Sequence, residues 1–150
     1  MTYKRLDPTF KATWITHLRL PPELGGYHQG SGTLRRAEFF DGELTDSYCC
    51  LGVACDLLGK DLWEQEFHPY EVNVSDSGRK VWGRIKDYYL VDHFTKPERE
   101  YHARLMEQDI IPKDLADKID LSAAAALALM DMNDTGKTFS EIADWIEVNL

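Results

Sequence analysis

The spacing of apolar residues predicts a helix near the start of the chain. In "DPTFKATWITHLRLPP", Phe10, Trp14 and Leu18 recur at every fourth position, which places them on one face of a helix. The Asp-Pro pair before this stripe is typical of a helix start, and the Pro-Pro pair at 21–22 ends it. We therefore expect an N-terminal helix that packs on the core through this face.

Helical patterns return in the last third of the chain. The segments "PKDLADKI", "LSAAAALALMDM" and "TFSEIADWIEVNL" each have the composition of a helix. The last begins with Thr138 and carries Glu141 three positions on, which is the spacing of a capping box. Residues 97–109, "PEREYHARLMEQD", predict one more helix, because a proline and acidic residues open the segment.

The middle of the chain predicts strands. "RAEFF" and "LTDSY" flank the Asp-Gly pair at 41–42, which is typical of a hairpin turn. Residues 60–95 have the least regular pattern, but "YEVNV" and "KVWGRI" flank "SDSG" and could form a second hairpin. Between these hairpins, "SYCCLGVACDLLG" is apolar nearly all round and predicts a buried helix that ends at Gly59. The predicted fold is α+β: a single helix-rich domain, residues 1–150, with a small antiparallel sheet.

Composition and charge narrow the range of functions. The 150 residues suit one compact domain, and no apolar run is long enough to cross a bilayer or to act as a secretion signal. This predicts a cytoplasmic protein with reduced thiols and no membrane partner. The formal net charge of -9 argues against nucleic acid as a partner, because an acidic protein repels phosphates. An anion site is expected in the N-terminal third, which holds Arg19, Arg35 and Arg36.

The adjacent cysteines Cys49 and Cys50 allow two interpretations. With Ser47 as N-cap, both thiols lie in the first helical turn, where the positive end of the helix can favour a thiolate nucleophile. The apolar surroundings instead favour small core residues, and Gly52 would let another backbone approach closely. We prefer packing and keep thiolate chemistry as the alternative. Three cysteines without metal-ligand spacing predict neither a disulfide framework nor a metal site, and no cofactor is expected.

The glycine loop, "YHQGSGTLRR" at residues 27–36, is the preferred candidate for ligand binding. Its glycines let the backbone approach a ligand, its hydroxyl groups can donate hydrogen bonds, and its arginines can pair with phosphate or carboxylate. It is neither a Walker motif nor a dinucleotide fingerprint. A surface turn that leads into the hairpin is the alternative. The predicted ligand-binding residues are Tyr27, Gln29, Ser31, Arg35 and Arg36.

The segment "DMNDTGKTFSE" resembles a calcium loop only in part. The bidentate carboxylate expected at its twelfth position is absent, so calcium is rejected. Asn133 is predicted to end one helix, Gly136 to permit the turn and Thr138 to cap the next helix. Asp134 has no role in this scheme, and it either holds the turn or faces a site.

Three motifs together point to a family. They are the "QG…LR" loop at residues 29–35, "YCCLGVxCD" at 48–56 and "NDxGxxFxEIA" at 133–143, where x marks a position that the motif leaves open. This combination resembles an uncharacterised family of small bacteriophage and prophage proteins, and residues 60–110 lie outside it. The resemblance implies a viral origin and a location in the host cytoplasm.

Three functional hypotheses follow. The leading one is an accessory protein that binds a small anionic, nucleotide-like ligand, helped by the N–H groups of Cys49 and Cys50, and that counters a host system. The second is a cysteine-dependent hydrolase or transferase, in which Gln29, Asn133 or Asp134 polarises the substrate. The third is an interaction module whose acidic C-terminal helices dock on a basic host protein. The oligomeric state is left open.

Overall fold

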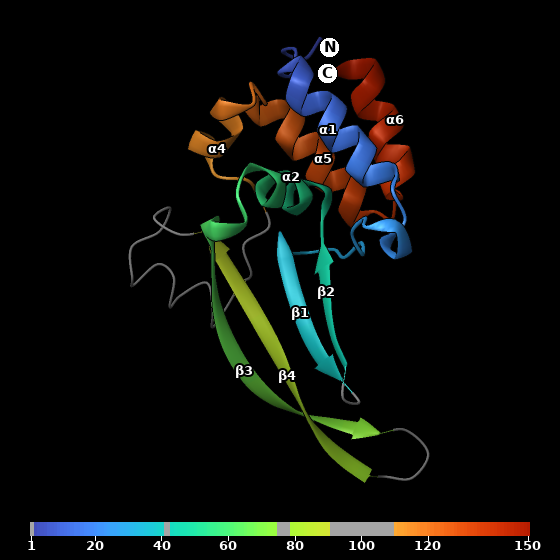
Figure 1. Ribbon diagram of the computed structural model, residues 1–150, viewed down its shortest axis with the longest axis vertical. Helices are drawn as coiled ribbons and strands as arrows, with labels where there is room; N and C mark the ends of the chain where they lie inside the picture. The colour runs from blue at the N-terminus through green and yellow to red at the C-terminus, as the bar shows by residue number, and fades with distance from the viewer. Residues whose placement is uncertain (1, 41–42, 75–78, 91–109) are drawn as a thin grey trace.

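A group of helices and a twisted antiparallel sheet make up the described part of the chain, residues 2–40, 43–74, 79–90 and 110–150 of a computed structural model (Figure 1). The α+β prediction is confirmed. In chain order the elements are α1 (Pro8–Arg19), the 3-10 turn η1 (Pro22–Leu24), β1 (Arg35–Phe40), β2 (Glu43–Tyr48), α2 (Cys50–Leu58), the 3-10 turn η2 (Lys60–Leu62), β3 (Trp63–Val74), β4 (Arg79–Leu90), α4 (Lys113–Lys118), α5 (Ala123–Asp134) and α6 (Phe139–Asn149).

The two terminal helices begin where the sequence predicts. The Asp7 carboxylate accepts a hydrogen bond from the N–H of Phe10 at 2.9 Å, and Trp14 and Leu18 on the predicted face are buried. The predicted capping box of α6 is present, because Thr138 and Glu141 each bond to the other's backbone N–H. Local signals therefore fix the start of both helices.

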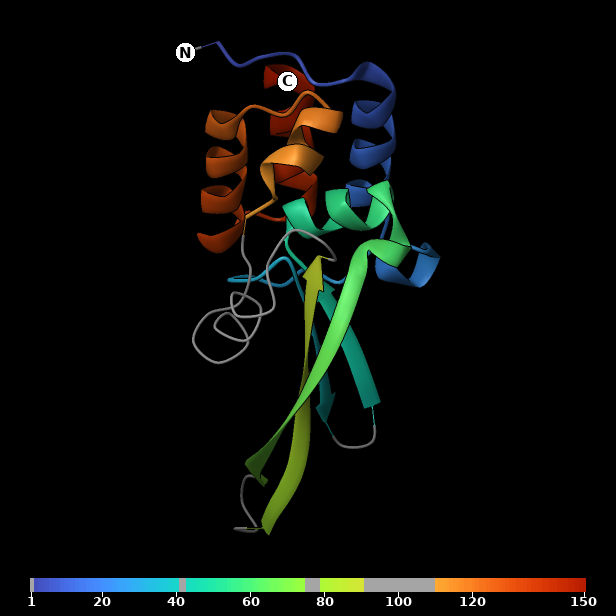
Figure 2. The same cartoon turned by 90° about the vertical axis from the view of Figure 1, so that its left-hand side faces the viewer.

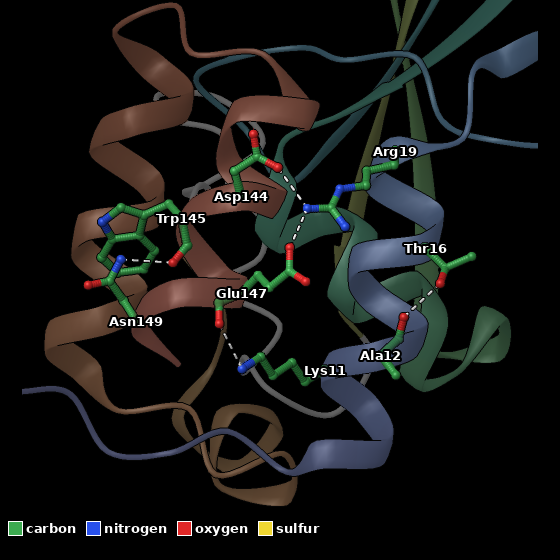
Figure 3. A network of polar contacts seen from close by, with 8 residues as sticks. All are labelled: Lys11, Ala12, Thr16, Arg19, Asp144, Trp145, Glu147 and Asn149. Carbon is green, nitrogen blue, oxygen red and sulfur yellow. Dashed lines mark hydrogen bonds and ion pairs between the residues drawn. The ribbon is translucent and has the colours of Figure 1, made fainter.

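Helices α1 and α6 lie side by side and carry polar contacts along their exposed seam (Figure 3). Arg19 donates to the carboxylates of Asp144 at 2.7 Å and Glu147 at 2.6 Å, and Lys11 Nζ donates to the Glu147 carbonyl at 3.1 Å. Exposed ion pairs contribute only about 0–1 kcal/mol each. The buried apolar faces are therefore the main force that holds this helix pair together.

Helix α2 lies between the other helices and the ends of the strands (Figure 1). Seven of its nine residues are buried, so no face of it is left for solvent. Gly52 is required by packing, because a Cβ atom there would lie 1.7 Å from the backbone oxygen of Leu34. This close approach fixes α2 against the segment that leads into β1.

The sheet has the strand order β2-β1-β4-β3, with antiparallel pairing throughout. Strands β1 and β2 form the predicted hairpin across residues 41–42. The second hairpin is longer than predicted, because β3 and β4 pair over twelve residues each, from Trp63↔Leu90 to Val74↔Arg79. It projects away from the helices (Figure 2). Pro69 argues against a strand in the sequence, because proline has no N–H to donate to a neighbouring strand. It is tolerated in β3 because that strand lies at the edge of the described sheet.

The predicted N-cap of α2 is wrong. Ser47 continues β2, where it pairs with Arg36, and Cys49 is the N-cap instead. The Cys49 sulfur accepts a hydrogen bond from the N–H of Gly52 at 3.4 Å. Of the two cysteines, Cys49 therefore caps the helix and Cys50 is its first residue. The helix predicted at 97–109 lies outside the described residues. Within the described residues, no helix has the length and apolar content that a membrane span requires.

Candidate functional site

The side chain of Gln29 joins the glycine loop to the turn between α5 and α6. Its Nε2 donates to Asn133 Oδ1 at 3.1 Å and to the Lys137 carbonyl at 2.7 Å, while its Oε1 accepts the N–H of Phe139 at 3.0 Å. The backbone partners fix the orientation of this carboxamide, because a carbonyl can only accept and an N–H can only donate. Gln29 Oε1 thus accepts a hydrogen bond from the first N–H of α6, which would otherwise have no partner within the helix.

Asn133 makes the matching contacts on the other side. Its Oδ1 accepts from the N–H of Cys50 at 3.1 Å as well as from Gln29, and its Nδ2 donates to the Gly30 carbonyl at 2.7 Å. Only 3% of Asn133 is exposed. One buried carboxamide therefore ties together the start of α2, the glycine loop and the end of α5. The sequence places Gln29, the cysteine helix and Asn133 in three separate motifs, and the structure brings them into contact.

Two further contacts hold the glycine loop. Asp134 Oδ1 accepts the N–H of Gly32 at 3.0 Å, so Asp134 holds the loop as well as ending α5. Gly30 pairs with β2 through its N–H to the Tyr48 carbonyl at 2.8 Å, and a Cβ atom on it would lie 2.7 Å from Ser47 Oγ. Glycine at position 30 is explained by this close approach to β2.

These contacts frame an open pocket of about 270 Å³, which we call the loop pocket. Its lining residues are Gln29, Gly30, Ser31, Asn133, Gly136 and Lys137. Ser31 and Lys137 are exposed, and the Lys137 ammonium lies 3.9 Å from a carboxylate oxygen of Glu141, which is longer than a hydrogen bond. Lys137 is not among the residues predicted from the sequence, although it directly follows "NDTG" at 133–136.

The N–H groups at the start of α2 are already bonded within the protein. The N–H of Cys49 donates to the Leu34 carbonyl at 3.2 Å, and that of Cys50 donates to Asn133. The expectation that these two groups help to bind an anion is therefore wrong, although the glycine loop does lie beside them. The side chain of Asn133 has taken the position that an anion would need.

The cysteine side chains lie in the core. Cys49 is 2% exposed, and Cys50 and Cys55 are fully buried. Burial raises the pKa of the Cys50 and Cys55 thiols well above the ordinary value, since a thiolate loses its hydration there. The Cys50 thiol donates to the Leu129 carbonyl at 3.5 Å. These observations agree with the packing interpretation, and they leave Cys50 without the raised thiolate fraction that a nucleophile needs.

Tyr27 and Arg35 belong to a different place, which we call the aromatic cluster: Tyr27, Arg35, Tyr48, Asp56 and Trp63. The Arg35 guanidinium lies 5.1 Å from the ring centre of Tyr48 and 5.4 Å from that of Trp63, within the range of cation–π attraction. The ring of Tyr27 meets Tyr48 edge-on at 4.8 Å. The cluster joins the strand ends to α2.

Neither arginine of the glycine loop lines the loop pocket. Arg35 also pairs with Asp46 at 3.1 Å, and 15% of its side chain is exposed. Arg35 and Arg36 are the first residues of β1, and successive residues of a strand face opposite sides of the sheet. The two arginines therefore face opposite sides of the sheet, and a role for them in ligand binding stays a prediction outside the loop pocket.

Asp56 is a buried carboxylate that the sequence analysis left without a role, although it ends the "YCCLGVACD" motif. It accepts from Tyr27 Oη and Lys60 Nζ, both at 2.7 Å, and from Trp63 Nε1 at 3.2 Å. Burial alone would raise the pKa of Asp56, but the hydrogen bonds from Lys60 and Tyr27 outweigh it and the pKa is lowered. The carboxylate therefore stays charged and organises the aromatic cluster.

The fold and the loop pocket define a small α+β protein whose polar pocket is framed by two carboxamides, Gln29 and the buried Asn133. Residues 6–150 match the model of the family described as a domain of unknown function, DUF8296, and the chain belongs to that family. The match includes residues 60–110, which the three motifs of the bacteriophage resemblance left out. No curated protein and no solved structure matches the chain. A phage origin stays a prediction.

Proposed function

We propose that the protein binds a small anionic, nucleotide-like ligand in the loop pocket. The observation that carries this proposal is the rigid frame of the pocket: Gln29, Asn133 and Asp134 bond it to three separate elements before any ligand arrives. A site that is already ordered loses little conformational freedom on binding, so its polar groups are available at low cost.

Lys137 takes the role that the sequence analysis gave to the arginines. It is the one lining residue of the loop pocket with a formal charge, and its ammonium can donate up to three hydrogen bonds to an anion. The Ser31 hydroxyl, also in the lining, adds a neutral donor. The rest of the earlier hypothesis, an accessory role against a host system, is kept as part of this proposal.

The two alternative functions gain less support. A cysteine-dependent hydrolase or transferase needs an accessible thiolate, whereas Cys50 is buried and its thiol pKa is raised. An acidic docking face on α6 is weakened by α1, because Arg19 already pairs with two of its carboxylates, Asp144 and Glu147. Neither the hydrolase or transferase nor the docking module is therefore preferred to the binding of a small anion.

The test compares Lys137→Ala with the matched control Lys113→Ala. Both lysines are exposed and pair with an acid four residues on, but Lys113 lies on α4, away from the loop pocket lining. Wild-type protein is mixed with pooled nucleoside monophosphates and analysed by native mass spectrometry, followed by calorimetry of any ligand retained. Loss of a charged hydrogen bond should weaken binding by about ten- to a hundredfold in Lys137→Ala.

The control separates a pocket effect from a general charge effect. Lys113→Ala should bind as the wild type does, and Ser31→Ala should weaken binding by a smaller factor than Lys137→Ala. Equal affinities for all four proteins, or a wild type that retains none of the monophosphates, would exclude the loop pocket as the anion site.

A further inference from the structure

The two carboxamides of the loop pocket each keep one hydrogen-bonding position unfilled among the described residues. Gln29 Oε1 can accept two hydrogen bonds and accepts one, from Phe139. Asn133 Nδ2 can donate two and donates one, to Gly30. Both side chains line the loop pocket, so a spare acceptor and a spare donor belong to the same lining.

The two carboxamides are neighbours. The bond from Gln29 Nε2 to Asn133 Oδ1, 3.1 Å long, keeps the two carboxamides in contact, and each is oriented by backbone partners that admit no flip. Only 3% of Asn133 is exposed, and a buried N–H that has no acceptor is costly, which applies to the second N–H of its Nδ2. A ligand group that supplies one acceptor and one donor would complete the hydrogen bonding of both carboxamides.

We infer that the loop pocket recognises the amide edge of a single planar ring, C=O to Asn133 Nδ2 and N–H to Gln29 Oε1, with the ligand's anionic group toward Lys137. This inference rests on the proposed function and specifies its ligand. The lactam edges of uracil and guanine have this pattern. The pocket, at about 270 Å³, is just below the range of about 300–1,000 Å³ usual for small-molecule sites, so it suits one ring rather than a dinucleotide.

The experiment varies the ligand and leaves the protein intact, because substitution of Gln29 or Asn133 would also break the frame of the pocket. Calorimetry with wild-type protein compares UMP and GMP with the same nucleotides methylated on the ring N–H, and with ribose phosphate, which has no base. The methylated nucleotides keep size and charge but cannot donate to Gln29 Oε1. UMP or GMP should bind about two- to tenfold more tightly than both its methylated form and ribose phosphate, since one hydrogen bond to a group that water can reach contributes about that factor.

Each outcome decides a different statement. Equal binding of the nucleotides, their methylated forms and ribose phosphate, all weakened by Lys137→Ala, would overturn the amide-edge inference and leave the anion site standing. Tight binding of an unmethylated nucleotide that Lys137→Ala does not weaken would support the amide edge and overturn the role of Lys137. If none of these compounds binds, both the inference and the proposed function are overturned.

Discussion

Replacement of Asn133 by alanine should destabilise the protein far more than a surface asparagine does. Asn133→Ala removes the acceptor of the Cys50 N–H, the acceptor of one Gln29 N–H and the donor to the Gly30 carbonyl. The partners belong to two segments of the chain, the glycine loop and the start of α2, while Asn133 itself lies in α5. The substitution therefore loosens α2, the glycine loop and α5 from one another at one point.

The expected loss follows from the burial of each partner. The Cys50 N–H lies in a residue that is fully buried, and leaving it unpaired costs about 1–3 kcal/mol. Gln29 and Gly30 line the open pocket, where water can replace the lost bond, so each adds about 0.5–1.5 kcal/mol. The sum is about 2–6 kcal/mol, a large share of the about 5–15 kcal/mol that stabilises a typical domain.

Urea denaturation followed by circular dichroism measures this difference, with Asn149→Ala as the control. Asn149 is exposed in the last turn of α6, and its Nδ2 donates one hydrogen bond to the Trp145 carbonyl at 2.9 Å (Figure 3). The control should change the free energy of unfolding by at most about 0.5 kcal/mol. If the two variants differ by less than about 1 kcal/mol, the carboxamide network contributes little and our account of the pocket's frame is wrong.

Three further predictions concern the core. Gly52→Ala should lower the thermal midpoint although alanine favours a helix by about 1 kcal/mol, because its Cβ would lie 1.7 Å from the Leu34 oxygen; a higher midpoint would contradict this contact. Cys50 and Cys55 should react with a thiol reagent only after urea unfolds the chain, since burial raises the pKa of both thiols; rapid labelling in buffer would show that they are accessible. Asp56→Asn should be less stable than the wild type at neutral pH, and the difference should shrink as the pH falls below 3.8, the carboxyl's ordinary pKa. A lowered pKa stabilises the fold above that value and ceases to do so once the carboxylate is protonated, so a difference that widens in acid would refute the role of Asp56.

The parts of the fold that the sequence predicts correctly are those with a local cause. The capping box of α6 joins Thr138 to Glu141, three residues apart, and Asp7 caps α1 over the same distance. Such signals need no knowledge of the tertiary structure. The pairing of β1 with β2 is equally local, because it runs from Phe40↔Glu43, three positions apart in the sequence.

The errors occur where the tertiary structure decides. Ser47 is a good N-cap residue by type, but pairing with Arg36 extends β2 through it and moves the start of α2 to Cys50. The strand β3 contains Pro69 and several charged residues, which interrupt the alternation of apolar and polar residues by which a strand is predicted. Its pairing with β4 over twelve residues outweighs these preferences.

The sequence predicts which residues belong to the candidate site better than it predicts how they are arranged. Gln29 and Asn133 were selected from their motifs, yet their contact spans 104 residues of sequence and no pattern along the chain reports it. Arg35 was selected by charge, which says nothing of the rings it packs against. The sequence shows that a guanidinium is present, whereas the structure shows that it lies over the rings of Tyr48 and Trp63.

The motifs that carry the bacteriophage resemblance supply the frame of the loop pocket rather than its exposed rim. Gln29, Gly30 and Asn133 fall on fixed letters of these motifs, and their polar groups bond mainly to one another and to the backbone. Ser31 and Lys137 fall on positions that the motifs leave open, and these two present the hydroxyl and the charge. Proteins that share the motifs should therefore keep the amide-lined floor while changing the group at the rim. We expect the ring-binding part of the site to be common to them and the preference for an anionic substituent to follow residue 137.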